Sequence, residues 1–319
     1  MLDQAVEPAL ERVTHPLLEK KRVTFFVQRA DLTHPQISGN KWYKLKYNLQ
    51  EAKAQGYRTV LSFGGSYSNH LHALAFAGNQ YQLKTVGIVR GEENEPLNPT
   101  LQDATDWGMR LIYLSRAEYK RRFEAQFLDR ITRGFEPHYL VPEGGANQLA
   151  LRGCAEISLA IEKQISTFDY LCVPCGTGAT LAGLVSGLKQ SEAKVLGFCA
   201  LKGLLDIEDK VMRWLQDAAV TRPVQWQILH DFHCGGFAKL SPELVRFMDD
   251  WSRFSPILLE PIYTGKMFYG IFRLLEQDYF TPGARIVAIH TGGLQGLRGI
   301  QKKMARLRAS CVNPANNPE

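Results

Sequence analysis

The chain lacks the features of a secreted, disulfide-stapled or membrane-spanning protein. Its six cysteines are spread through 319 residues, without the dense short spacing of a disulfide scaffold. No apolar run approaches the ~20 residues of a membrane-spanning helix. The first residues carry acidic groups instead of the apolar segment of a secretory signal. We therefore expect a cytoplasmic protein with reduced thiols and no membrane partner.

A strong excess of charge of one sign is also missing. The chain has 38 Lys and Arg against 32 Asp and Glu, which gives a net charge of +6. Its densest basic run is Lys120-Arg121-Arg122, with no interleaved aromatic residues. Nucleic-acid grooves need clustered cations of that kind, so we expect no nucleic-acid partner. A small anionic ligand fits the balance better.

Pairs of cysteines or histidines at the spacing of metal ligands are also rare in the sequence. Cys172 and Cys175 have the spacing of zinc ligands, but no second pair or histidine answers them. His70 and His72 are two residues apart, so in a helix they point to different faces. We expect no metal site.

Short apolar runs alternate with longer amphipathic ones, and no repeat or Pro/Gly linker interrupts them. This alternation predicts an α/β fold in which helices cover both faces of mainly parallel sheets. The expected strands are Val23–Arg29, Thr59–Phe63, Lys84–Val89, Arg110–Tyr113, His138–Leu140, Tyr170–Val173, Lys194–Cys199, Gln225–Leu229 and Arg285–Ile289. The expected helices include Trp42–Gln55, Ser68–Gly78, Ala146–Lys163, Thr180–Leu188, Glu208–Asp217 and Gly265–Gln277.

Four glycine-rich turns follow expected strands, where ligands bind in open parallel sheets. Glycine lets the backbone approach a ligand, and the next helix offers free N–H groups. The turns are Gly64–His70, Glu143–Asn147, Cys175–Thr180 and His290–Gly293.

The Gly176–Thr180 turn is the best candidate for a phosphate cradle, because it follows a strand and opens a helix. A dinucleotide fingerprint would need glycine where Leu181 stands, and an acidic residue after the next strand. Both are missing, which favours a monophosphate. A plain tight turn is the structural alternative.

Lys41 begins a helix directly after a Gly-Asn turn. Such a lysine is held by its backbone near an anionic ligand, as needed for a Schiff base with an aldehyde cofactor. The alternative is a solvated charge at a helix start.

The other candidate side chains also have structural readings. Ser68 is an ordinary N-cap, although Ser68, Asn69 and His70 could surround a carboxylate. Tyr263 could be a core or interface aromatic, and Thr264 an N-cap.

Six segments in a fixed order carry a family resemblance that runs from about Phe25 to about Leu297. They are SGNKWYKLKYNL, LSFGGSYSNHLHALA, VPEGGAN, PCGTGATLAGL, EPIYTGKMFYGI and IHTGGLQGL. The chain resembles the 1-aminocyclopropane-1-carboxylate deaminase / D-cysteine desulfhydrase family, pyridoxal-phosphate enzymes of fold type II.

The resemblance implies two three-layer α/β domains with mainly parallel sheets, as in the tryptophan synthase β-like fold. The larger, cofactor-binding domain would comprise residues 1–51 plus 161–319, and the smaller would be inserted at 52–160. Pyridoxal 5'-phosphate and a small amino-acid substrate would sit in the cleft between them. The resemblance also implies a homodimer.

On the cofactor side, the resemblance makes Lys41 the Schiff-base lysine and, once released, the base that moves the α-proton. Asn69 would hydrogen-bond the ring hydroxyl of the cofactor, and Thr264 would face the pyridine nitrogen. Lys44 and the phosphate-binding turn would hold the phosphate. The residues of that turn are Cys175, Gly176, Thr177, Gly178, Ala179 and Thr180.

On the substrate side, Ser68 would touch the substrate carboxylate or transfer a proton, with Asn69 and His70 beside it. Tyr263 matches the catalytic tyrosine of the family. Phe237, which is also expected to contact the cofactor, stands where a second active-site tyrosine is usual; its ring can stack but cannot donate a proton. Tyr67 replaces the usual glutamine.

The resemblance also makes Thr264 the residue that discriminates between the two activities, since the ring-opening deaminases of the family carry a glutamate there and the desulfhydrases a hydroxyl residue. A hydroxyl leaves the ring nitrogen largely neutral, which suffices to expel a thiolate. The sequence thus favours desulfhydrase-like β-elimination giving a 2-oxo acid and ammonia. The alternatives are a 1-aminocyclopropane-1-carboxylate deaminase, another lyase or racemase of this fold, a cofactor binder without turnover, and a plain nucleotide-binding module.

Overall fold

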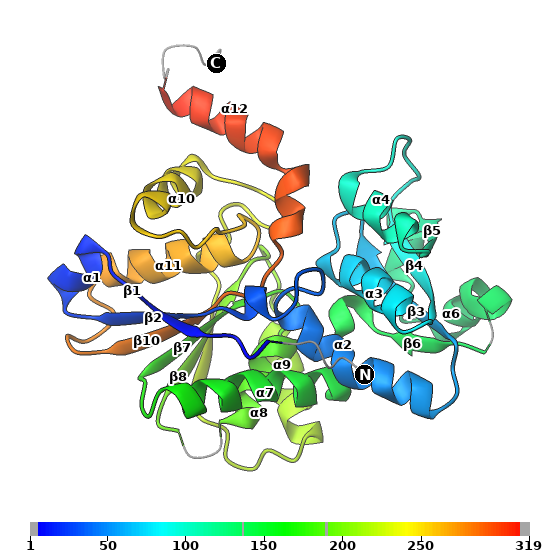
Figure 1. Cartoon of the computed structure of the whole chain (residues 1–319), viewed down its shortest axis with the longest axis horizontal. Coiled ribbons are helices and arrows are strands. Elements are labelled where there is room, and N and C mark those ends of the chain that lie inside the picture. Colours follow the sequence, from blue (N-terminus) through cyan, green and yellow to red (C-terminus); the bar gives the residue numbers. More distant parts are fainter. Residues whose placement is uncertain (1–5, 136, 189–190, 313–319) are drawn as a thin grey trace.

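A computed structural model describes residues 6–135, 137–188 and 191–312 of the chain. The described residues form an α/β fold with two separate sheets (Figure 1). The predicted α/β class with mainly parallel sheets is confirmed. None of the described helices is both long and apolar enough to cross a membrane.

The larger sheet has six strands in the order β1-β2-β10-β7-β8-β9. Its strands are parallel except β1, which pairs antiparallel with β2. Its strand bounds are β1 Leu10–Val13, β2 Thr24–Gln28, β7 Tyr170–Cys175, β8 Lys194–Cys199, β9 Trp226–Leu229 and β10 Arg285–Ile289.

The smaller sheet has four parallel strands in the order β5-β4-β3-β6. It lies at the right of Figure 1, with α3, α4 and α6 around it. Its strand bounds are β3 Thr59–Gly65, β4 Lys84–Arg90, β5 Arg110–Leu114 and β6 Tyr139–Val141.

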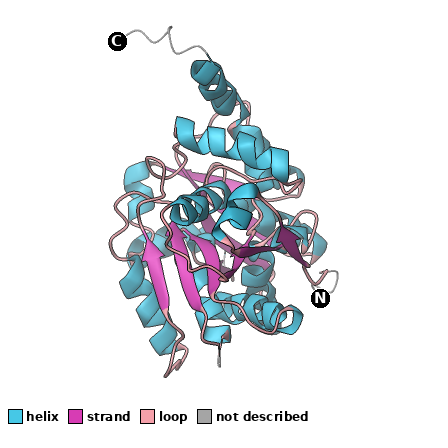
Figure 2. Ribbon diagram, turned by 90° about the vertical axis from the view of Figure 1, so that its left-hand side faces the viewer, coloured by secondary structure: helices cyan, strands magenta, loops and turns pink. Residues whose placement is uncertain are grey.

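Helices flank the strands on either side (Figure 2). The α-helices are α1 Pro16–Lys21, α2 Asn40–Ala54, α3 Asn69–Gln80, α4 Pro99–Asp106, α5 Arg116–Lys120, α6 Ala125–Thr132, α7 Gln148–Gln164, α8 Ala179–Gly187, α9 Ile207–Asp217, α10 Pro242–Phe254, α11 Thr264–Glu276 and α12 Gln301–Val312. The 3-10 helices are η1 Ala30–Leu32, η2 Arg133–Phe135, η3 Glu143–Gly145 and η4 Leu294–Gly299.

All nine expected strands occur, each within two residues of its predicted bounds. The edge strand β1 was not expected. Its four residues, LERV, bury only Val13, so the strand shows no apolar alternation that a pattern could reveal.

Two helices, α2 and α7, connect the sheets. Helix α2 leads from β2 in the larger sheet to β3 in the smaller one, and α7 leads back from β6 to β7. They pack closely, because a Cβ at Gly153 of α7 would lie 1.9 Å from the Tyr43 carbonyl oxygen of α2. The domain boundaries near residues 52 and 160 fall inside these two helices and stay our proposal.

Candidate active site around Lys41

The start of α2 is fixed by a glycine that no other residue can replace without displacement. Gly39 has φ 68° and ψ −146°. A Cβ built there would lie 1.9 Å from the carbonyl oxygen of Thr291. The turn after β10 therefore lies directly against the residue that precedes the helix, and Lys41 follows as the second residue of α2.

The amine of Lys41 is hydrogen-bonded and partly buried. Its Nζ donates to Asn40 Oδ1 at 2.8 Å, and Asn40 Nδ2 donates to Thr180 Oγ1 at 2.9 Å. Burial, followed by repulsion from Lys44, lowers the pKa of Lys41 from 10.5 to about 7. A large share of the amine is therefore neutral and nucleophilic near pH 7.

The predicted phosphate cradle lies next to the start of α2, in contact with Asn40. Strand β7 ends at Cys175 and α8 begins at Ala179, with Gly178 left-handed at φ 83°. The first N–H groups of a helix have no partner within it, so this start can bind an anion. The Asn40–Thr180 hydrogen bond joins the cradle to α2.

Lys44 lies beside the same turn. Its Nζ donates to the Gly144 carbonyl oxygen at 3.0 Å, and a Cβ at Gly144 would lie 3.2 Å from Thr177 Cγ2. The side chain is 3% exposed, and burial lowers its pKa from 10.5. The Lys44 ammonium group would therefore lie close to an anion bound in the cradle.

His70 offers a neutral acceptor in the same region. Ser62 Oγ donates to the Val141 carbonyl oxygen at 2.8 Å, so the His70 Nε2 that lies 2.8 Å away donates to Ser62. His70 Nδ1 is buried without a hydrogen-bond partner among the described residues. Burial, then the charges of Lys41 and Lys44, lowers the His70 pKa well below 6.5.

Ser68 and Asn69 begin α3. Ser68 is the N-cap, and its Oγ accepts from the Leu71 N–H at 3.2 Å. The cap leaves the Ser68 hydroxyl hydrogen available to another acceptor. Asn69 Oδ1 accepts from Gln295 Nε2 at 2.5 Å.

A buried carboxylate organises the start of α11. Glu260 is 2% exposed. Its Oε1 accepts from the N–H groups of Tyr263 at 2.8 Å and Thr264 at 2.6 Å, and its Oε2 from the N–H of Ile262 at 2.8 Å. Thr264 is therefore not the N-cap that the sequence suggested; Tyr263 holds the cap position and has no side-chain cap bond.

The Thr264 side chain is fully buried. Its Oγ1 accepts from the Glu260 N–H at 3.1 Å and lies 3.2 Å from the Glu260 carbonyl oxygen. This hydroxyl is thus engaged by Glu260, and its contact with a pyridine nitrogen stays a prediction.

Tyr263 and Phe237 lie together. Their ring centroids are 6.1 Å apart in an edge-to-face arrangement, and a Cβ at Gly176 would lie 3.5 Å from the Tyr263 hydroxyl oxygen. The structure thus brings the predicted catalytic tyrosine over the glycine turn. Phe237 is 44% exposed.

Sequence reasoning missed three polar residues of this region, Asn40, Glu260 and Gln295. Each lies inside a motif already quoted, in SGNK, EPIYTGK and IHTGGLQGL. The signal that could have found them was a polar residue beside a glycine turn. Their partners, however, come from other segments or from the folded shape of the turn.

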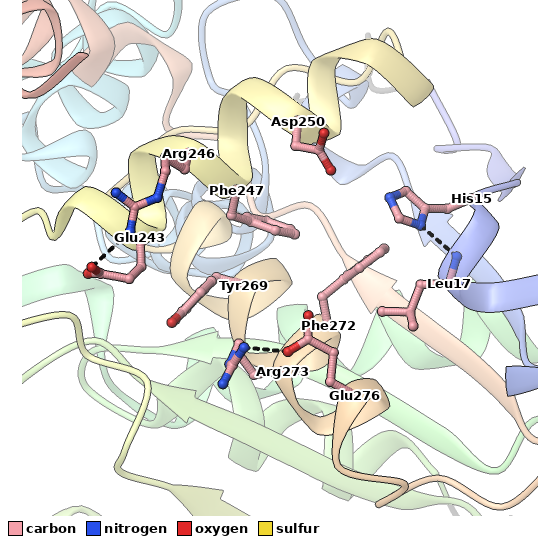
Figure 3. A pocket seen from close by; sticks show the side chains of 10 residues that line it. All are labelled: His15, Leu17, Glu243, Arg246, Phe247, Asp250, Tyr269, Phe272, Arg273 and Glu276. Carbon is pink, nitrogen blue, oxygen red and sulfur yellow. Dashed lines mark hydrogen bonds and ion pairs between the residues drawn. The ribbon is translucent and has the colours of Figure 1, made fainter. Parts of the chain in front are cut away.

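The structure also has an open surface groove of about 410 Å³ (Figure 3). It is formed by α1, α10 and α11 and contains none of the predicted site residues. It is lined by His15, Leu17, Glu243, Arg246, Phe247, Asp250, Tyr269, Phe272, Arg273 and Glu276.

A lysine whose pKa lies near 7 and a glycine cradle with a buried cation beside it together fit an aldehyde cofactor that carries a phosphate. These site features, in an α/β fold with two mainly parallel sheets, define the protein as a fold type II pyridoxal-phosphate enzyme.

The comparison with known proteins specifies the family. The model of the family described as "Pyridoxal-phosphate dependent enzyme" matches residues 10–292, and the chain belongs to this family. Its cofactor is pyridoxal 5'-phosphate.

Two curated relatives carry the names that the sequence suggested. A Thermotoga maritima protein, provisionally named 1-aminocyclopropane-1-carboxylate deaminase, is 30% identical over 93% of this chain and 97% of its own. An Arabidopsis thaliana mitochondrial protein, named bifunctional D-cysteine desulfhydrase/1-aminocyclopropane-1-carboxylate deaminase, is 29% identical over 88% of this chain and 75% of its own. The predicted resemblance to this family is confirmed.

A solved structure described as an ACC deaminase homologue shares the fold. Its TM-score is 0.84 at 24% identity, over 95% of this chain and 94% of that one.

Proposed function

We propose that the protein catalyses α,β-elimination on a small amino acid, with D-cysteine as the reference substrate. One cysteine and one water become pyruvate, ammonia and hydrogen sulfide, with loss of the Cα–H bond and the Cβ–S bond. The observation that carries this proposal is the Lys41 amine, with its pKa of about 7, in the same site as the glycine cradle.

Lys41 is the proposed base. Pyridoxal phosphate, when bound, supplies the electron sink that makes the α-proton of an attached amino acid acidic. A base works best when its pKa lies near the working pH. The Lys41 amine satisfies this condition because burial and Lys44 disfavour its charged form.

Tyr263 is the proposed hydrogen-bond donor to the leaving sulfur. Burial raises the pKa of its hydroxyl above the usual range, so the group stays protonated at neutral pH. Its position over Gly176 places this donor beside the cradle. A departing thiolate would accept a hydrogen bond from this hydroxyl and take its proton from water.

Ser68 is the proposed partner of the substrate carboxylate. Its Oγ already accepts from the Leu71 N–H, so the hydroxyl hydrogen remains for a carboxylate oxygen. The free N–H groups at the start of α3 favour the same anion.

The alternative is a deaminase that opens the cyclopropane ring of 1-aminocyclopropane-1-carboxylate. The hydroxyl at Thr264 favours elimination, because a hydroxyl gives a weaker sink than a carboxylate at the ring nitrogen. The buried Glu260 carboxylate, 3.3 Å from Thr264 Oγ1, supports the alternative. The names of both relatives support it too.

Parallel assays of the purified holoenzyme separate these activities. We expect sulfide and pyruvate from D-cysteine, much less of both from L-cysteine, and little 2-oxobutanoate from the cyclopropane substrate. Release of 2-oxobutanoate without sulfide would reverse the ranking. A lysine-bound cofactor without any product would show a binder that has lost turnover.

The matched variants are Lys41→Ala and Lys46→Ala. Both lysines lie on α2, but Lys46 Nζ pairs with the Glu156 carboxylate of α7 at 2.7 Å. Product formation should disappear in the first variant and persist in the second. Equal loss in both variants would contradict the role of Lys41.

A further inference from the structure

Gln295 of η4 connects two helices of the smaller-sheet side. Its Nε2 donates to Asn69 Oδ1 at the start of α3, and its Oε1 accepts from Thr100 Oγ1 of α4 at 2.7 Å. Thr100 is 1% exposed. The three side chains form one hydrogen-bond chain, and Asn69 and Gln295 are separated by 226 positions in sequence.

The direction of this chain is fixed at Gln295. The guanidinium of Arg298 is an obligate donor, and its Nη2 lies 3.4 Å from the same Gln295 oxygen. The glutamine therefore presents its carbonyl oxygen to Arg298 and Thr100 and its amide nitrogen to Asn69. Asn69 must then accept through Oδ1.

The other polar atom of the Asn69 side chain is Nδ2. It carries two hydrogens and has no hydrogen-bond partner among the described residues. Nδ2 would lie 2.8 Å from a Cβ at Gly293, so the glycine leaves room beside the amide. With Oδ1 occupied by Gln295, the Asn69 side chain has only its Nδ2 hydrogens left for a ligand.

We propose that Gln295 is a positioning residue that holds Asn69 as a fixed hydrogen-bond donor to the deprotonated ring oxygen of the cofactor. The inference rests on the proposed function and on the role that the family resemblance gives to Asn69, a hydrogen bond to this ring oxygen. A donor stabilises the anionic form of an oxygen and lowers its pKa. If the Asn69 amide could rotate and present Oδ1 to the cofactor, it would stabilise the neutral hydroxyl instead.

A merely structural role makes a different prediction. The same two segments are also joined by an outer ion pair of Arg298 with Asp103, and Asp103 Oδ2 lies 3.0 Å from His72 Nε2. If Gln295 only held η4 against α4, loss of Asp103 would have the same consequences as loss of the Gln295 amide.

The test uses Gln295→Glu, Gln295→Met and the control Asp103→Ala. A carboxylate at position 295 accepts from all its neighbours, so the Asn69 amide nitrogen should turn to it and leave Oδ1 toward the cofactor. Gln295→Met removes the amide at similar length. The readouts, without substrate, are the dissociation constant of pyridoxal phosphate and the pH titration of its visible band.

We expect Gln295→Glu to weaken cofactor binding about tenfold or more, as for a hydrogen bond to a charged group, and to move the titration to higher pH. Gln295→Met should change both in the same direction but less. Asp103→Ala should leave the titration in place even if it lowers the melting temperature. Thr100→Val removes the hydroxyl that donates to Gln295. It should move the titration slightly in the same direction as Gln295→Met.

An unchanged titration and affinity in both Gln295 variants, with a normal wild-type spectrum, would overturn this inference alone. An equal shift in Asp103→Ala would also overturn it. A wild-type protein without a lysine-bound cofactor would overturn the proposed function as well.

Discussion

The part of the site proposed to face the cofactor and the part proposed to face the substrate are built differently. On the cofactor side, polar groups are fixed by other polar groups, as in the chain from Lys41 through Asn40 to Thr180. On the substrate side, Tyr67 and Phe237 are 42% and 44% exposed. Phe237 is held by a ring contact with Tyr263.

This difference indicates where the chain is constrained. A cofactor of fixed shape needs hydrogen-bond donors at fixed positions. Linked hydrogen bonds between side chains supply them, because each bond fixes the orientation of the next side chain. The substrate side departs from the family pattern at both aromatic positions, and their exposure means that such changes cost little stability. The residues proposed to contact the substrate are therefore less constrained by folding stability than those proposed to contact the cofactor.

The largest expected effect follows from Gly39→Ala on the cofactor side. The new Cβ would overlap the Thr291 carbonyl oxygen, and the backbone conformation favours glycine. We expect a loss of about 3 kcal/mol or more in the free energy of unfolding, with loss of the lysine-bound cofactor band. Urea unfolding and absorption spectra measure both.

Gly56→Ala is the matched control. Gly56 also has a positive φ, 78°, but a Cβ there meets nothing within 4 Å. The expected cost is about 1–2 kcal/mol, with the band unchanged. Equal effects of the two substitutions would contradict the close contact at Gly39.

The second prediction concerns the pH dependence of cofactor uptake after removal of the cofactor. Only the neutral amine of Lys41 can form the bond. Because its pKa is lowered to about 7, uptake should fall about tenfold per pH unit below 7 and level off above it. Stopped-flow absorption at several pH values measures the rate.

Lys44→Met sharpens this result. Removing a neighbouring positive charge favours the protonated amine, so the midpoint should move to higher pH. A wild-type midpoint near that of an ordinary lysine would show that Lys41 is solvated.

The third prediction is a smaller loss of stability in Thr264→Val. The substitution leaves the Glu260 N–H without the acceptor at 3.1 Å in a fully buried place. We expect a cost of about 1–3 kcal/mol in urea unfolding. Thr264→Ser keeps the hydroxyl and should lie nearer the wild type; a serine variant as unstable as the valine variant would rule out the hydrogen bond as the cause.

The smallest expected effect comes from Phe237→Tyr on the substrate side. The side chain is exposed, so stability should change by less than about 0.5 kcal/mol. Water can already donate protons there, so we expect kcat/KM for D-cysteine to rise by less than about tenfold. Phe123→Tyr, at a position that is 79% exposed, is the control. A change in cofactor affinity in Phe237→Tyr would contradict the separation of the two sides.

Local signals explain what could be predicted from the sequence. Apolar alternation located nine strands. A clear start signal, the N-cap Ser241 followed by Pro242 and Glu243, begins α10, and it could have added that helix. The edge strand β1 could not be found in this way, because its formation depends on pairing with β2.

The sequence by itself determined the α/β alternation, the glycine turns and the order of the site motifs, because apolar spacing and turn residues act within a few positions. Only the tertiary structure decided the near-neutral pKa of Lys41, which depends on burial beside Lys44. It also decided that Glu260 holds the start of α11 and that Gln295 reaches Asn69. Burial, and contacts between distant segments, exist only after the chain has folded.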